Sequence, residues 1–238
     1  VGLAQGPAQR KGGKPTLIIE SGDLALDAKS LEEILADMGA TGKTDEVIKI
    51  PGNSVRLLVF TGLGKASSSY GHELLRRAAG AASRTLSNQK SATFALPAHN
   101  LEGVSAVAQG AALGAYLFNE FRSDEVVTSN SSLASAKIFT PHAAKTEFKD
   151  AVTEAAVIAQ YTFLTRDLIN TPPSHLNPAS FADRMNAEVK AAGGARAGLS
   201  ITVMTETTLK SKGYGGITAV GQGSANPPRL VRISYTPT

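Results

Sequence analysis

The sequence predicts an α/β fold in which a long helix joins two lobes. Between residues 15 and 145, short apolar runs typical of strands alternate with longer stretches of helical spacing. Residues 147–170 then form one amphipathic helix by their apolar spacing, after which helix and strand patterns begin again. These observations predict an N-terminal α/β domain at 15–145, a linker helix at 146–171 and the start of a second α/β domain at 172–238.

Composition restricts the class of protein. With 42% hydrophobic and 18% charged residues among 238, the chain is expected to be globular and able to bury a core. It contains no apolar run near the roughly 20 residues that span a bilayer and no signal-peptide pattern, so we expect a soluble, cytoplasmic protein without membrane contact. Cysteine is absent, which excludes disulfides and thiolate metal sites. The net charge of +4 permits nucleic-acid contact but is more typical of a solvated surface.

The start of the chain is predicted to be flexible. Residues 1–14 are rich in Gly, Ala, Gln and basic residues, as loose ends are. Residues 16–19 form the first expected strand. Ser30 and Glu33 then make a capping box for a helix that ends near Gly39.

A nearly all-apolar run at 55–60 predicts a strand that is covered on both faces. It leads into Gly62-Leu63-Gly64-Lys65 and then a helix, a context in which backbone N–H groups can bind phosphate. The segment lacks the P-loop layout, and Ser67 stands where a dinucleotide fingerprint needs a third glycine. A structural tight turn is therefore the preferred interpretation. The lobe is completed by an expected helix from about Tyr70 to Leu86, a strand at 91–96, a helix at 104–116 and a strand at 136–139.

The helix at 147–170 would be about 36 Å long if continuous. Thr171-Pro172-Pro173 ends it, because proline lacks the N–H donor and disfavours helical dihedrals in the residue before it. Asn177 can cap a second helix with Pro178 at its first position. The pattern predicts a rod between two lobes.

The second lobe reads as the opening of a sheet. Expected elements are a helix at 181–191, a strand at 201–204, a short helix capped by Thr205, and strands at 216–220 and 230–235. A finished α/β domain does not end on unpaired, uncovered strands, so we expect the chain to stop inside this lobe.

Candidate catalytic and binding residues are few. His72-Glu73 opens like a zinc-protease motif, but Arg76, followed by Arg77, stands where its second histidine belongs. His99 and His142 are isolated in the sequence, and His175 is expected to pack against or cap the turn between the helices.

Four basic residues lie near one another on a predicted helix and its exit: Arg76, Arg77, Arg84 and Lys90. A solvated helix face is the preferred interpretation, and a contact surface for a phosphate backbone is the alternative.

Two segments resemble one known family. They are Arg166–Pro178, which reads RDLINTPPSHLNP, and Gly215–Leu230, which reads GGITAVGQGSANPPRL. In sequence and in order both resemble the leucyl (cytosol) aminopeptidase family, with a looser likeness at 59–65. The resemblance implies a parent protein that is a cytoplasmic metallo-aminopeptidase, a hydrolase that uses two divalent cations, zinc or manganese, to release N-terminal residues such as leucine from peptides. It also implies a homo-hexamer.

The same resemblance implies that the metal ligands and catalytic residues lie beyond Thr238, because no residue here matches the family's Asn-Thr-Asp-Ala-Glu-Gly-Arg type signature. We therefore expect no catalytic, cofactor-binding or metal-binding residue in this chain, no bound metal and no peptide hydrolysis by the chain alone. The loop at 221–228 matches the family but offers no base, nucleophile or metal ligand, so a rigid turn is its preferred interpretation.

The family's N-terminal lobe is similar to macro domains, which bind ADP-ribose, and some bacterial members bind DNA. A nucleotide-binding or nucleic-acid-binding module is therefore the alternative function. A third hypothesis, preferred over binding, is that this lobe only positions the catalytic lobe and restricts access to it.

Overall fold

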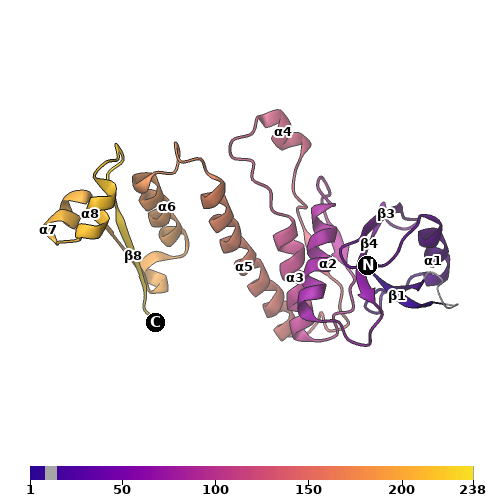
Figure 1. The fold of residues 1–238 in the computed structure, drawn as a ribbon. Helices are drawn as coiled ribbons and strands as arrows, with labels where there is room; N and C mark the ends of the chain where they lie inside the picture. Colours follow the sequence, from indigo (N-terminus) through magenta and orange to yellow (C-terminus); the bar gives the residue numbers. More distant parts are fainter. Residues whose placement is uncertain (9–14, 238) are drawn as a thin grey trace. The chain divides into compact units, whose positions relative to one another are not determined.

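The computed structural model describes residues 1–8 and 15–237, and the chain divides into two compact units (Figure 1). Unit 1 is Val1–Thr165 and unit 2 is Arg166–Thr238. Both units combine helices and strands, which confirms the predicted α/β class.

Unit 1 is built on a four-stranded sheet. Its strands are β1 (Gly2–Ala8), β2 (Pro15–Glu20), β3 (Val47–Pro51) and β4 (Leu57–Lys65), in the order β2-β1-β4-β3. β1 and β4 are parallel in the centre, while β2 and β3 pair antiparallel at the edges.

The prediction of a flexible start is wrong for residues 2–8, because they form the central strand β1. Their sequence, GLAQGPA, lacks the β-branched and aromatic residues that favour strands. Only pairing with β2 on one side and β4 on the other specifies this conformation. Residues 9–14 of the predicted flexible start lie outside the described residues.

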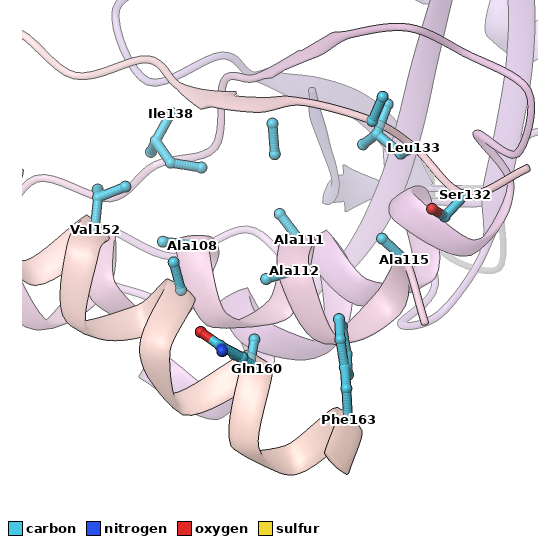
Figure 2. A pocket seen from close by; sticks show the side chains of 14 residues that line it. Ala108, Ala111, Ala112, Ala115, Ser132, Leu133, Ile138, Val152, Gln160 and Phe163 are labelled. Atoms are coloured by element: carbon cyan, nitrogen blue, oxygen red, sulfur yellow. The ribbon is translucent and has the colours of Figure 1, made fainter. Parts of the chain in front are cut away.

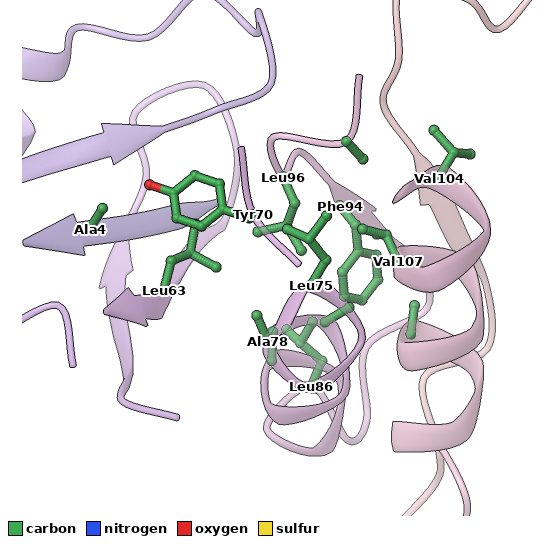
Figure 3. Close-up of a cluster of buried hydrophobic side chains, with 14 of the residues drawn as sticks. Ala4, Leu63, Tyr70, Leu75, Ala78, Leu86, Phe94, Leu96, Val104 and Val107 are labelled. Atoms are coloured by element: carbon green, nitrogen blue, oxygen red, sulfur yellow. The ribbon is translucent and has the colours of Figure 1, made fainter. Parts of the chain in front are cut away.

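Helices cover both faces of this sheet. Leu3 and Ala4 follow each other in β1 and therefore point to opposite faces. Leu3 packs with Phe60 and with Leu35 of α1 (Ala28–Asp37), whereas Ala4 belongs to a second cluster that includes residues of α2 (His72–Arg84) and α3 (Leu101–Gly114). Figure 3 shows this second cluster between the sheet and the two helices. The N-cap of α1 is Asp27, which accepts the N–H of Ser30, so the predicted cap Ser30 lies within the first turn.

The helices α2 and α3 approach each other closely along glycine. The Cα of Gly110 faces the carbonyl of Arg76, and that of Gly114 faces Gly80 across the helix pair. Two buried hydroxyls add hydrogen bonds to this packing. Ser83 Oγ of α2 donates to Ala111 O of α3 at 2.7 Å, and Thr61 Oγ1 of β4 donates to Ala78 O of α2 at 3.1 Å.

The remaining part of unit 1 follows the predicted order. β5 (Ala92–Phe94) pairs in parallel with β6 (Ala136–Ile138), and between them the chain forms α3 and a short helix α4 (Asp124–Ser129). The strand β3 and the helix α4 have no counterpart among the predicted elements.

The predicted long helix is confirmed as α5 (Thr146–Asn170). Its buried side chains are Phe148, Ala155 and Ala159, which the apolar spacing predicts, and Ala151, which it does not. The division between the units falls within α5, since residues up to Thr165 belong to unit 1. The apolar spacing of residues 147–170 also includes Ile169, but this side chain is 77% exposed.

Unit 2 contains α6 (Pro178–Ala191), a 3-10 turn at Gly194–Ala197, β7 (Leu199–Met204), α7 (Glu206–Ser211), α8 (Gly215–Gly221) and β8 (Leu230–Tyr235). The predicted cap of α6 is confirmed: Asn177 Oδ1 accepts the N–H of Ser180, and Ser180 Oγ accepts the N–H of Asn177. β7 and β8 pair antiparallel.

The predicted strand at 216–220 is wrong, because these residues lie in α8. Ile217 and Val220 are three residues apart, a spacing that fits a helix as well as a short strand. The helical alternative also lets Thr218 Oγ1 donate to the carbonyl of Tyr214 at 3.1 Å. A run of five residues between glycines is too short for periodicity to decide.

We expect Gly110→Ala to destabilise unit 1 by about 2–4 kcal/mol, because its Cβ would overlap the Arg76 carbonyl and force α2 and α3 apart. Gly80→Ala is the matched control, since its nearest neighbour is Gly110 O at 3.4 Å, an ordinary contact. Urea unfolding should place the control within about 1 kcal/mol of wild type. Equal stabilities for the two variants would contradict this account of the helix pair.

Candidate functional sites

Gly62-Leu63-Gly64-Lys65 is the end of strand β4, so the prediction of a tight turn is wrong. The helix α2 begins seven residues after Lys65, at His72. The N–H groups of Gly62 and Gly64 donate to the carbonyls of Glu46 and Gly42 at 2.8 and 2.9 Å. Because these donors are already engaged, the segment presents no phosphate-binding nest.

The two glycines serve packing against the loop at 41–46. Gly62 lies against the carbonyl of Lys43, where any side chain would overlap it, and Gly64 has a φ of +75°. The carboxylate of Glu46 organises the same loop, since it accepts the N–H of Gly42 at 2.6 Å and the N–H of Thr41 at 3.0 Å. This glycine pattern is therefore structural.

Tyr70 forms a polar contact at the edge of the core that the sequence did not indicate. Its hydroxyl donates to Glu20 Oε1 at 2.9 Å and accepts the N–H of Ser67 at 3.3 Å. Burial raises the pKa of Tyr70 to about 12, and the bond to Glu20 adds to this rise. Fifty residues separate the partners Glu20 and Tyr70, so no local signal could have found the pair.

The four histidines do not converge. His72 is exposed at the start of α2, and His99 Nδ1 is 4.0 Å from Asp23 Oδ2 on the surface. The ring of His142 lies 5.1 Å from that of Phe148. In the turn between α5 and α6, His175 Nδ1 lies 3.0 Å from Ser174 Oγ. The backbone carbonyl of His175 accepts a hydrogen bond from Ser180 Oγ at 2.8 Å. His175 thus takes part in the turn before α6, as predicted.

The basic residues of α2 are partly neutralised. Arg76 pairs with Glu73 and also donates to Gln109 Oε1 at 3.0 Å, while Arg77 pairs with Asp45. Arg84 and Lys90 are exposed. A surface on which two of the four cations are paired with carboxylates within the protein favours the solvated-face interpretation.

In unit 2, the loop at 221–228 is closed by a contact between its two ends. Pro228 is buried and lies against Gly221, where an added Cβ would come within 2.6 Å of the proline ring. The N–H of Asn226 donates to Ser224 Oγ at 3.1 Å. The geometry supports the predicted rigid turn.

An apolar cavity of about 380 Å³ lies within unit 1 between α3, α5 and the segment that leads into β6 (Figure 2). Alanines form most of its wall, Ile138, Val152 and Phe163 add larger apolar surface, and Gln160 contributes an amide. Such a lining suits an apolar group, and its polar side chains, the Ser132 hydroxyl and the Gln160 amide, supply no acid or base. The sequence analysis predicts a helix at 104–116 but does not reveal the cavity beside it.

Within residues 1–8 and 15–237, no three His, Asp or Glu side chains lie close enough together to hold a metal ion. The donors present therefore do not fit the two-cation centre that the family resemblance implies for the parent protein. Over the same residues, no helix is long and apolar enough to cross a membrane.

Comparison with known families gives two matches in the order of the chain. Residues 11–125 match the N-terminal domain of the cytosol aminopeptidase family, and residues 163–238 match the catalytic domain of the same family. The second match contains both segments that carry the sequence resemblance.

Individual relatives agree with this. A probable cytosol aminopeptidase of Streptomyces avermitilis is 38% identical over 248 aligned positions, which cover 99% of this chain and 47% of the relative. Among solved structures, the bottromycin maturation enzyme BotP in complex with Mn is 32% identical with a TM-score of 0.72, covering 90% of this chain and 43% of BotP. A tomato leucine aminopeptidase mutant is 22% identical with a TM-score of 0.67, and the match covers 87% of this chain and 41% of the tomato chain. At this identity the match supports the fold alone. The chain thus spans about half the length of the relatives it matches.

The Tyr70 contact makes the stability of unit 1 depend on pH. A phenol whose folded pKa of about 12 exceeds its ordinary value of 10.0 stabilises the folded state below pH 10, and this contribution is lost as pH rises from 10 to 12. Tyr70→Phe removes it. The difference in unfolding free energy between wild type and Tyr70→Phe should shrink or reverse by on the order of 2 kcal/mol over this range. Urea unfolding at several pH values measures it, and a difference that does not change with pH would contradict the assignment.

Proposed function

Because this chain belongs to the cytosol aminopeptidase family, we propose that it forms part of a metal-dependent aminopeptidase. This hydrolase would release N-terminal residues, such as leucine, from peptides in the cytoplasm. The observation that carries the proposal is the match of two domains of one family in their proper order along the chain. The relatives' name, cytosol aminopeptidase, supports the reaction and the compartment.

In this proposal the parts of the chain have different roles. Residues 15–145 form a noncatalytic lobe, residues 146–171 a linker helix, and residues 172–238 the opening part of the catalytic lobe. The engaged N–H groups of Gly62 and Gly64 and the paired Arg76 and Arg77 support a structural role for the noncatalytic lobe. No contact of the described residues favours the alternative nucleotide-binding or nucleic-acid-binding function.

The parent protein would use two divalent cations, zinc or manganese. The manganese complex of the 32% identical BotP supports a divalent metal in this family. In general such a pair polarises the scissile carbonyl and lowers the pKa of a bound water. Because the His, Asp and Glu side chains of the described residues are scattered, we assign none of them to the metals and expect residues 1–238 alone to be inactive. Peptides are the proposed substrates, and a homo-hexamer is the proposed assembly.

If the metal ligands lie outside residues 1–238, the purified chain should not hydrolyse peptides. Residues 1–238, supplied with Mn²⁺ or Zn²⁺, should release no more product from a leucine amide than a protein-free blank. The relative from Streptomyces avermitilis, assayed in parallel, should hydrolyse the amide and lose its activity when a chelator is added. Chelator-sensitive hydrolysis by residues 1–238 would show that they hold a complete metal site, contrary to the proposal.

A further inference from the structure

Strand β6 of unit 1 has one unpaired edge. In a parallel pair, alternate residues of each strand turn their N–H and C=O groups toward the partner strand. The carbonyl of Ser135 accepts the N–H of Ala92, so the odd-numbered residues of β6 bond to β5. The N–H and C=O groups of Ala136 and Ile138 therefore point away from β5, and β6 pairs with no other strand of the described residues. These groups form the free edge of β6.

The apolar cavity of unit 1 lies beside this edge. Ala136 and Ile138, two residues apart on one face of β6, form part of its wall. Val152 and Ala156 of α5 line it from the other side, and Figure 2 shows Ile138 and Val152 on β6 and α5 around the cavity. All lining residues belong to unit 1. The cavity is therefore a feature of the N-terminal lobe and its helix α5.

The layers of unit 1 account for the cavity. The helix α2 contacts β4 and α3 contacts β6, so each of these two helices covers a strand. The helix α5 lies on the far side of α3 from α2 (Figure 1). The next position in the sheet, beside the free edge of β6, holds none of the described strands. The cavity thus occupies the space that the side chains of one more strand would fill.

An extended peptide matches both the edge and the cavity. Its main chain supplies the hydrogen-bond partners that the free edge lacks, the mode by which peptides add to exposed sheet edges. Its alternate side chains then point into the cavity. An apolar cavity of about 150 Å³ accommodates benzene. A cavity of about 380 Å³ therefore has room for two apolar side chains. A small apolar molecule would fill the same space but leave the edge unpaired.

Lys137 restricts the occupant further. Its side chain lies on the face of β6 opposite to the cavity and is exposed. If β6 of a second copy paired antiparallel with this edge, the two Lys137 side chains would face each other, and like charges in that position are destabilising. An edge lysine is a common device against such strand association. A peptide with an acidic residue at this position would gain an ion pair instead.

We propose that the free edge of β6 and the cavity beside it form a binding site for peptide substrates. The peptide adds as an extended strand, turns two apolar side chains into the cavity and places an acidic residue beside Lys137. This inference rests on the proposed function for the source of the peptide. It goes beyond that function because the site lies outside residues 172–238, the part assigned to the catalytic lobe. The site holds a substrate without cleaving it.

Binding to residues 1–238 tests the site apart from hydrolysis. The probe is a fluorescent peptide with the central sequence Thr-Leu-Glu-Leu-Thr and blocked ends, which an aminopeptidase cannot cleave. Its fluorescence anisotropy should rise to saturation as the chain is added. A peptide with Ser in place of both Leu, and one N-methylated at its three central residues, should each bind at least ten-fold more weakly. No binding up to about 1 mM, or undiminished binding of either altered peptide, would overturn the proposal.

Two phenylalanine substitutions on α5 locate the site. Ala156 lines the cavity, whereas its neighbour Val157 does not and is 47% exposed. Ala156→Phe should fill the cavity and weaken probe binding at least ten-fold, while Val157→Phe should change it less than two-fold. Ala136→Pro removes one donor of the free edge without breaking a bond to β5, and should also weaken binding at least ten-fold. Equal probe affinities for Ala156→Phe and Val157→Phe would contradict the site. The altered peptides decide the question if a variant fails to fold.

Hydrolysis by the natural polypeptide that carries this sequence tests the source of the peptide. Ale156→Phe should raise KM for an extended peptide of about twenty residues at least five-fold more than it raises KM for leucine amide. If leucine amide is hydrolysed and both KM values respond equally, the substrate site is overturned and the aminopeptidase stands. Probe binding to a polypeptide that hydrolyses no peptide would argue against the aminopeptidase and leave a peptide site without a substrate role.

Discussion

The parallel pairing of β1 with β4 is the contact on which unit 1 depends. It places residues 2–5 at the centre of the sheet, against residues 61–65. With Leu3 and Ala4 fixed in this register, one face of the strand receives α1 and the other receives α2 and α3. Ordering such a long-range pair has a loop-closure cost, which the two apolar clusters on either side offset. Gly62 and Gly64 of β4 support the same pairing, because they let the loop at 41–46 pack directly on the strand.

The parts of this fold that the sequence predicts are those with strong periodicity or clear caps. The apolar spacing of α5 and the Asn177-Pro178 start of α6 predict these helices within one or two residues. By contrast, β1 carries no strand propensity of its own, and the Gly62–Lys65 segment resembles a turn until its N–H groups are seen to be paired. In α8, a short apolar run between glycines fits both a strand and a helix. In each of these cases tertiary contacts decide a conformation that local sequence leaves open.

The candidate sites, too, depend on tertiary contacts that local sequence does not reveal. The sequence excludes a zinc-protease site at His72-Glu73, and the structure places His72 on the exposed surface of α2. No sequence motif marks the Tyr70–Glu20 pair or the cavity between α3 and α5, because both bring together residues far apart in the chain. Family resemblance, carried by the segments at 166–178 and 215–230, gives what geometry alone does not: a reaction and a class of substrate to propose. The geometry in turn shows that the N–H groups of Gly62 and Gly64 are engaged, and that no three His, Asp or Glu side chains of the described residues lie close enough to hold a metal.

The measurement that tests the central claim most directly is the intact mass of the natural polypeptide that carries this sequence, combined with an aminopeptidase assay with and without chelator. The account predicts a mass well above the 24.6 kDa of these 238 residues and a leucine-releasing activity that the chelator abolishes. A mass of 24.6 kDa with no such activity would contradict it and would leave a stand-alone protein whose function has to be sought in binding.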